Sequence, residues 1–210
     1  MLLSVCHPEA PTATNRGPSL GVRVPEVRRL AAAAVARHPF DSAEQVRATA
    51  LELWRTAGFR EERYAAIDLT AGRLVATDLQ MLPVYEEIIR QGAWWDFADA
   101  VAGRICTLLQ AHRTEMTGVI LAWSTDPDLW IRRASLTAQL QAKANTDPEL
   151  LRSVIEANRP DPEFFIRKAM GWSLREYAKT APDWVAEFVA GHKGSISPLS
   201  RREALKNLAR

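Results

Sequence analysis

Trp95 and Asp99 are the strongest candidates in this sequence for binding a ligand or acting on it. They are four positions apart, so on a helix they lie one above the other on the same face. The other side of that helix carries an apolar core stripe, made of Trp94, Phe97, Val101, Ile105 and Leu108. Ala102 and Gly103 lie beside the pair and leave space around it. A large ring and a carboxylate facing away from the core predict a binding surface; the alternative is that a second layer of helices buries the ring.

A second tryptophan lies off a core stripe in the segment 163–180. That helix has an apolar side made of Ile166, Met170, Leu174 and Tyr177. Trp172 projects from the opposite side, surrounded by Phe165, Lys168, Arg175, Glu176 and Lys179. Because a fully exposed Trp is unusual, this face is covered either by another helix or by a ligand.

Two further groups of basic residues are candidates for holding an anion. Arg133 lies on the flank of an apolar stripe, where its stem can pack while its charged head reaches a cleft edge. A structural arginine bound to a neighbouring helix end is an equally good interpretation. The terminal segment predicts a capping box of Ser200 and Glu203, followed by a positive patch of Arg201, Arg202 and Lys206. Such a patch is usually a solvated helix end, but it also suits phosphate.

The composition limits the classes of function. The 210 residues are 47% hydrophobic and 25% charged, with a net charge of +2, which indicates a globular chain whose attraction for anions must come from local clustering. Cys6 and Cys106 predict neither a disulfide framework nor a metal cluster, so we expect the protein to be located in the reducing cytoplasm. The sequence contains neither a glycine-rich phosphate loop nor an apolar run long enough to span a membrane.

The chain divides into an irregular arm over residues 1–19 and a single domain over 20–210. Helices are expected from Pro25 to Arg37, from Ser42, over 64–75, from Pro83 to Gly92, from Trp95, and from Met116 to Trp123. In the second half a proline followed by an acid recurs at Pro127, Pro148, Pro162 and Pro182, and alternate members lie about 35 positions apart. This pattern predicts an all-α superhelical solenoid of HEAT-like antiparallel helix pairs, whose concave face is the usual binding surface.

The sequence resembles the AlkD-type DNA alkylation repair proteins, which are HEAT-like-repeat DNA glycosylases. The resemblance extends from residue 20 to about 208 and is strongest over 163–180; it also includes 21–28, 94–99, 130–134 and 198–204. The family's catalytic pattern of two tryptophans, an aspartate and an arginine falls on Trp95, Trp172, Asp99 and Arg133. Family members also have a helical pair before the Gly21 segment, which the pattern of residues 1–19 does not match.

The resemblance implies hydrolysis of the N-glycosidic bond of purines alkylated at N3 or N7, without base flipping and without a cofactor or metal. Asp99, Trp95 and Trp172 are the expected catalytic residues. The expected DNA contacts are Arg133, Lys168, Arg175, Lys179, Arg201, Arg202 and Lys206. The expected partner is double-stranded DNA containing alkylated purines, bound by a monomer that has no membrane association.

Two other classes of function fit the same pattern of residues. One is a non-catalytic HEAT-like protein that binds DNA structure, although the acid at position 99 argues against it. The other is a HEAT protein-interaction module, in which the aromatic residues would be hot spots for a partner surface. Salt-sensitive DNA binding separates the interaction module from the two DNA proteins, and base release separates the glycosylase from the binder.

Overall fold

The structure is a computed structural model that describes residues 17–208, and the regular secondary structure of this part is entirely helical. No strand occurs within it. The α-helices are α1 Val24–Arg37, α2 Ala43–Thr56, α3 Arg60–Leu69, α4 Leu82–Gly92, α5 Trp95–Ala111, α6 Arg113–Trp123, α7 Leu129–Thr137, α8 Pro148–Asn158, α9 Phe164–Tyr177, α10 Pro182–Gly191 and α11 Pro198–Ala204, with short 3-10 turns at Leu79–Met81 and Lys143–Asn145. This confirms the predicted all-α, HEAT-like architecture.

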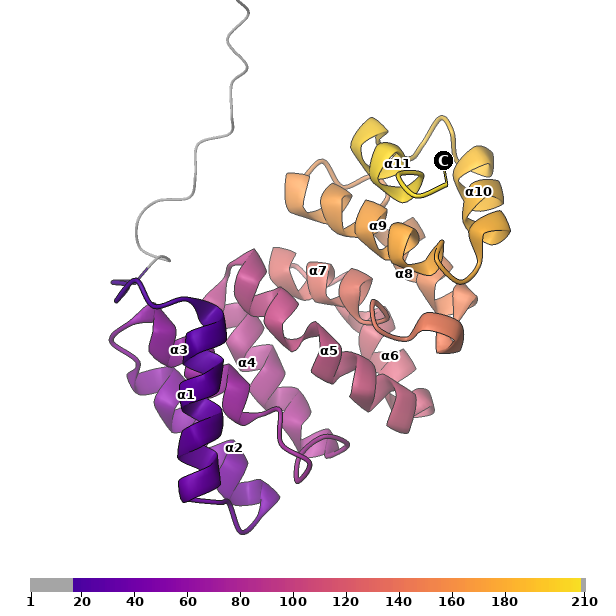
Figure 1. The fold of residues 1–210 in the computed structure, drawn as a ribbon. Coiled ribbons are helices and arrows are strands. Elements are labelled where there is room, and N and C mark those ends of the chain that lie inside the picture. Colours follow the sequence, from indigo (N-terminus) through magenta and orange to yellow (C-terminus); the bar gives the residue numbers. More distant parts are fainter. Residues whose placement is uncertain (1–16, 209–210) are drawn as a thin grey trace, which may run out of the picture.

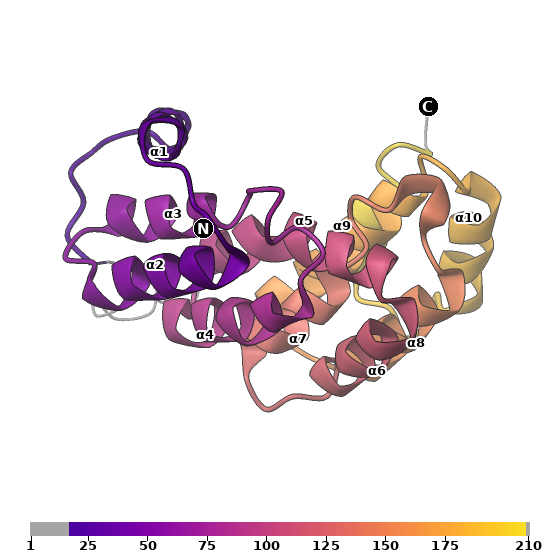
Figure 2. The ribbon, with the colours of Figure 1, turned by 90° about the horizontal axis from the view of Figure 1, so that it is seen from below.

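Successive helices pack as antiparallel pairs that form two layers. Helices α3, α5, α7, α9 and α11 follow one another along one layer, each in contact with the next, while α2, α4, α6 and α8 lie in the other. Helix α1 lies across α3 at the N-terminal end. Figure 2 shows that the array bends, with α1 and the C-terminal end on the same side of it. We call the layer from α3 to α11 the inner layer.

Of the four predicted proline starts, α8 and α10 begin at Pro148 and Pro182, whereas α7 and α9 begin two residues after Pro127 and Pro162. The Asp128 carboxylate accepts hydrogen bonds from the backbone N–H groups of Trp130 and Ile131, and Asp147 does the same for Glu149 and Leu150. These bonds satisfy N–H groups that have no partner inside the helix. The apolar sides then pack into one core, in which Phe97, Val101, Ile105, Ile166, Met170 and Leu174 are each at most 1% exposed.

The segment before α1 is bound to the start of α3 by the Arg60 N–H, which donates to the Pro18 carbonyl at 3.0 Å, and by the Glu61 carboxylate. Glu61 accepts hydrogen bonds from the Ser19 hydroxyl at 2.7 Å and from the backbone N–H groups of Leu20 and Val22 at 3.0 and 3.2 Å. These donors, the Ser19 hydroxyl first, lower the pKa of Glu61 to about 2. Residues 17–23 are not helical; residues 1–16 of the predicted arm lie outside the described residues.

Two local predictions are wrong. The helix expected over 64–75 ends at Leu69, because the Thr70 hydroxyl donates to the Ile67 carbonyl and the chain then turns. The capping box expected at Ser200 and Glu203 is replaced by an earlier cap. The hydroxyl of Ser197 accepts from the Ser200 N–H, so α11 begins at Pro198. In the described part no helix is long and apolar enough to cross a membrane.

Candidate functional site

Trp95 is the first residue of α5, and its side chain is exposed. The preceding helix α4 ends at Gly92, where a Cβ atom would lie 2.8 Å from the Phe97 ring, so glycine permits the tight α4–α5 corner. Ala93 then adopts a left-handed backbone conformation (φ 42°) and reverses the chain. The Trp95 residue is 44% exposed, and its ring stacks on no other aromatic ring of residues 17–208. It is therefore available to a ligand, as the sequence predicts.

Asp99 lies one turn further along α5 and is held by Arg133 of α7. The Arg133 Nε donates to Asp99 Oδ1 at 2.9 Å and its Nη2 donates to Oδ2 at 2.8 Å. Its Nη1 donates to the Phe165 carbonyl at 2.6 Å. One guanidinium thus connects α5, α7 and α9, and it fixes the plane of the Asp99 carboxylate.

This position of Arg133 differs from the sequence-based expectation of a head at the cleft edge. The Arg133 side chain is 5% exposed, and each of its three nitrogens already donates to a carboxylate or carbonyl. Three of the five guanidinium N–H donors are used in these bonds, and the burial of the side chain leaves the group poorly placed for a phosphate. Arg133 therefore orients Asp99, whose side chain is 16% exposed and remains open to a ligand.

A second set of polar contacts fixes the start of α5. Asp96 accepts from the guanidinium of Arg60 and from the hydroxyl of Tyr64, both on α3. The Arg60 Nε also donates to the Tyr64 hydroxyl at 2.6 Å, which closes the network. Burial first, and then the neighbouring Asp96 carboxylate, raise the pKa of Tyr64. Because Asp96 follows Trp95 directly, this network restrains the backbone that carries the exposed ring.

An aromatic cluster fills the space between the N-terminal ends of α5, α7 and α9. The rings of Trp94, Trp130 and Phe165 lie 5.0–5.9 Å apart, at tilted or edge-on angles. Trp94, which the sequence places on the core side of α5, is half-buried. The cluster packs three inner helices together close to the Phe165 carbonyl that Arg133 binds.

Trp172 is half-buried on α9 and points away from the core residues Met170 and Leu174. No ring of residues 17–208 stacks on it. Its neighbour Gly171 packs directly against α11, since a Cβ there would lie 2.6 Å from the Glu203 Cβ. Helices α9 and α11 are therefore in close contact, and Trp172 lies next to that contact.

Apart from Arg133, the basic residues predicted to contact DNA fall into two groups. Lys168 and Arg175 both bind Glu203, at 2.9 and 2.6 Å, and these partners, Lys168 first, lower the pKa of Glu203. Lys179 binds Glu176 at 2.6 Å. The remaining three, Arg201, Arg202 and Lys206, are exposed and form no ion pair within residues 17–208. No ion pair within residues 17–208 neutralises this second group.

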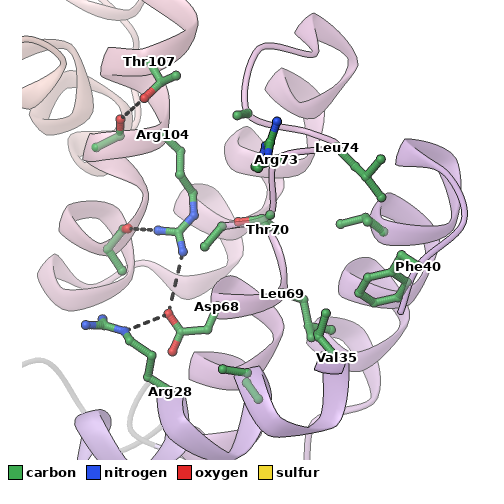
Figure 3. Close-up of a pocket in the computed structure, with 18 of the residues that line it drawn as sticks. Arg28, Val35, Phe40, Asp68, Leu69, Thr70, Arg73, Leu74, Arg104 and Thr107 are labelled. Carbon is green, nitrogen blue, oxygen red and sulfur yellow. Dashed lines mark hydrogen bonds and ion pairs between the residues drawn. The ribbon is translucent and has the colours of Figure 1, made fainter. Parts of the chain in front are cut away.

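A hollow of about 890 Å³ opens between α1, the turn after α3, and α5 (Figure 3). Asp99 is one of the residues that line it. In its wall Asp68 binds Arg28 at 3.4 Å and lies 3.7 Å from Arg104. A second hollow of about 650 Å³ lies between the end of α7 and the end of α9. The described residues contain no group of His, Cys, Asp and Glu side chains arranged to hold a metal ion.

Comparison with known proteins gives the family. The model of a family described as "DNA alkylation repair enzyme" matches residues 10–208. The chain belongs to this DNA alkylation repair enzyme family. It is similar to a solved structure described as a predicted DNA alkylation repair enzyme from Enterococcus faecalis, with 32% identity over 93% of this chain and 90% of that chain, and a TM-score of 0.82.

Two solved structures with lower sequence identity share the fold of this DNA alkylation repair family member. AlkD2 from Streptococcus mutans is 18% identical, covers 89% of this chain and 90% of that chain, and has a TM-score of 0.66. A second Streptococcus mutans structure, smu.31, is 17% identical and also has a TM-score of 0.66, over 88% of this chain and 92% of that chain. No similar chain is found among the curated proteins.

In this DNA alkylation repair family member, sequence reasoning found Trp95, Asp99, Trp172 and Arg133 but missed Arg60 and Tyr64, which hold the start of α5. Trp95, Asp99 and Trp172 follow from helical spacing. Arg60 and Tyr64 were not predicted, because their partner Asp96 lies at least 32 positions away. A polar residue directly after Trp95 was the one available signal, since a carboxylate at a helix start needs a donor or solvent.

Proposed function

We propose that this protein is a DNA glycosylase that hydrolyses the N-glycosidic bond of purines alkylated at N3 or N7, without flipping the damaged base. The observation that carries the proposal is the position of the Asp99 carboxylate. Asp99 lies on the same face of α5 as the exposed Trp95, and Arg133 of α7 holds its carboxylate in a fixed plane. Membership of the DNA alkylation repair enzyme family supports it.

Alkylation at N3 or N7 gives the purine a positive charge, so the base is a good leaving group without a general acid. When the C1′–N bond breaks, its electron pair goes to the base and neutralises that charge. Positive charge then develops on the deoxyribose. Asp99 stabilises this charge and positions the attacking water, whose oxygen bonds to C1′ and whose proton passes to the carboxylate or to solvent.

The two tryptophans have a separate role in this proposal. The face of an indole ring attracts a cation by roughly 0.5–2 kcal/mol, depending on how far the pair is desolvated. Trp95 and Trp172 both present rings that no other ring covers within residues 17–208. They contact the charged lesion nucleotide, whereas Arg201, Arg202 and Lys206 bind phosphates and set the register of the duplex.

The proposed partner is double-stranded DNA that contains alkylated purines, bound by a monomer in the cytoplasm. Of the two other classes of function, a DNA-structure binder would bind methylated duplex without releasing base. An interaction module would bind neither damaged nor intact DNA in a salt-sensitive way.

The test is incubation of the protein with a duplex that contains 7-methylguanine, with free base measured by chromatography. Release faster than spontaneous depurination, with the strand left unbroken at an abasic site, supports the proposal. Tight salt-sensitive binding without release would assign the protein to the non-catalytic class.

A further inference from the structure

Gln141, in the turn after α7, lies on the inner layer beside the candidate site. Its amide packs over Gly103 of α5, where a Cβ atom would lie 2.7 Å from the Gln141 Nε2 and 2.9 Å from its Oε1. Gly103 follows Asp99 by four positions, so the two share one helix face. The Gln141 amide is therefore about one helical turn, roughly 5–6 Å along α5, from the position of Asp99.

The amide of Gln141 has no structural task in the described part of the chain. The side chain is exposed, and no group of residues 17–208 forms a hydrogen bond with it. Gln139, two positions earlier, shows the contrast. Its amide is buried, accepts from the Asp147 N–H at 2.7 Å and donates to the Asp147 carbonyl at 3.0 Å. Gln139 stabilises the turn, and Gln141 presents the same chemical group to the surface.

Gln141 also lies where the two hollows of the inner layer meet. It lines the first hollow together with Asp99, and it lines the second hollow between the ends of α7 and α9. A ligand that extends from one hollow to the other passes over its amide. Gly103 leaves the space in which that amide lies.

We propose that Gln141 hydrogen-bonds the edge of the damaged purine and so helps to determine which alkylated base is excised. This inference rests on the proposed glycosylase function. A glutamine amide carries an acceptor and two donors in one plane, which suits a purine edge that offers a donor beside an acceptor. N7-alkylguanine keeps such an edge in the minor groove, formed by N3 and the N2 amino group. N3-alkyladenine keeps one in the major groove, formed by N7 and the N6 amino group.

Two substitutions remove the amide from the site in different ways. Gln141→Met keeps the length of the side chain and removes its hydrogen bonds. Gly103→Ala leaves Gln141 intact but places a methyl group where the amide lies, and the flexible end of Gln141 can move aside without a cost to folding. Gly118→Ala in α6 is the matched control, since a Cβ there meets no atom within 4 Å.

The experiment uses DNA treated with a methylating agent, which contains both 7-methylguanine and 3-methyladenine, and measures the release rate of each base. We expect Gln141→Met and Gly103→Ala to shift the ratio of the two rates in the same direction by about tenfold, the size of one bidentate base contact. Gly118→Ala should leave the ratio unchanged. A selective loss of 7-methylguanine release identifies the minor-groove edge, and a selective loss of 3-methyladenine release identifies the major-groove edge.

An unchanged ratio in both variants, with the wild type active, overturns the inference and leaves the glycosylase proposal intact. If the wild type releases neither base, the glycosylase proposal fails and the inference is decided by binding. Gln141→Met must then weaken binding to methylated duplex more than binding to unmethylated duplex. Equal weakening of both, or no weakening, overturns it.

Discussion

Arg133 and Asp99 form a bidentate ion pair across two inner helices, with both nitrogen–oxygen distances below 3.0 Å. The arginine is buried and the carboxylate is partly open, so the pair presents one face of Asp99 to a ligand. This geometry gives the two residues different roles, which the sequence motif alone does not distinguish. Asp99 acts on the substrate, and Arg133 determines where the carboxylate points.

The first prediction concerns this orientation. Arg133→Lys keeps the positive charge but cannot form the planar two-point contact or reach the Phe165 carbonyl at the same time. We expect single-turnover base release to fall at least about tenfold, corresponding to about 1.4 kcal/mol of lost transition-state stabilisation. DNA affinity should change little, because the guanidinium contacts protein groups. A large loss of affinity instead would mean that Arg133 holds phosphate.

The second prediction tests the aromatic faces. For each of Trp95 and Trp172, a change to Phe keeps a ring and a change to Leu keeps only bulk. We expect the Leu variants to lose more excision of a cationic lesion than the Phe variants, up to roughly thirtyfold for a contact of about 2 kcal/mol. The excision rate of a cationic lesion and that of a neutral lesion are each divided by the rate at which the same lesion is lost spontaneously. Equal losses in the Phe and Leu variants would show that the rings act only by packing.

The third prediction concerns the unpaired charge on α11. Changing Arg201 and Arg202 to Ala should weaken binding to damaged and undamaged duplex equally and reduce the slope of log affinity against log salt by about 0.9 for each lost phosphate contact. Lys193→Ala, which removes an exposed lysine that has no ion pair within residues 17–208, is the control. A loss limited to damaged DNA would place the two arginines at the lesion.

The fourth prediction is a pH dependence of stability set by Glu61. Its pKa is about 2 in the folded protein, below the ordinary value of 4.5, so its contribution to stability is complete above pH 4.5 and is lost as the pH falls toward 2. Glu61→Gln should therefore lower the melting temperature at pH 7, and its difference from the wild type should shrink over that interval. Glu52→Gln, an exposed acid, should show no such convergence. A difference that is constant with pH would mean that the bonds to residues 19–22 do not depend on the charge.

The sequence predicts those parts of the fold that depend on local signals. Pro148 and Pro182 open helices where expected, and Gly92 ends one. The helix expected to continue past Leu69 ends there, because the Thr70 side chain competes for a backbone carbonyl. That competition is decided by the tertiary position of the turn, which apolar periodicity does not report.

In the candidate site, too, local spacing predicts some residues, and the long-range partners cannot be predicted. Helical spacing finds Trp95 and Asp99, since both are on one helix. It cannot find the partner of Asp99, which is 34 positions away, or the Glu203 carboxylate that neutralises Lys168 and Arg175. The basic face expected on α9 is therefore less positive than its sequence indicates. Long-range pairing, and not residue type, decides which charges remain free.

The catalytic role of Asp99 is tested by single-turnover release of 7-methylguanine from a duplex by the wild type and by Asp99→Asn, with duplex affinity measured in parallel. Asp183→Asn, which changes an exposed acid on α10, is the matched control. We expect Asp99→Asn to lower release by at least about a hundredfold while its affinity stays within a few-fold, because the carboxylate acts on the transition state. Release by Asp99→Asn at the rate of the wild type and of Asp183→Asn would contradict the assigned chemistry.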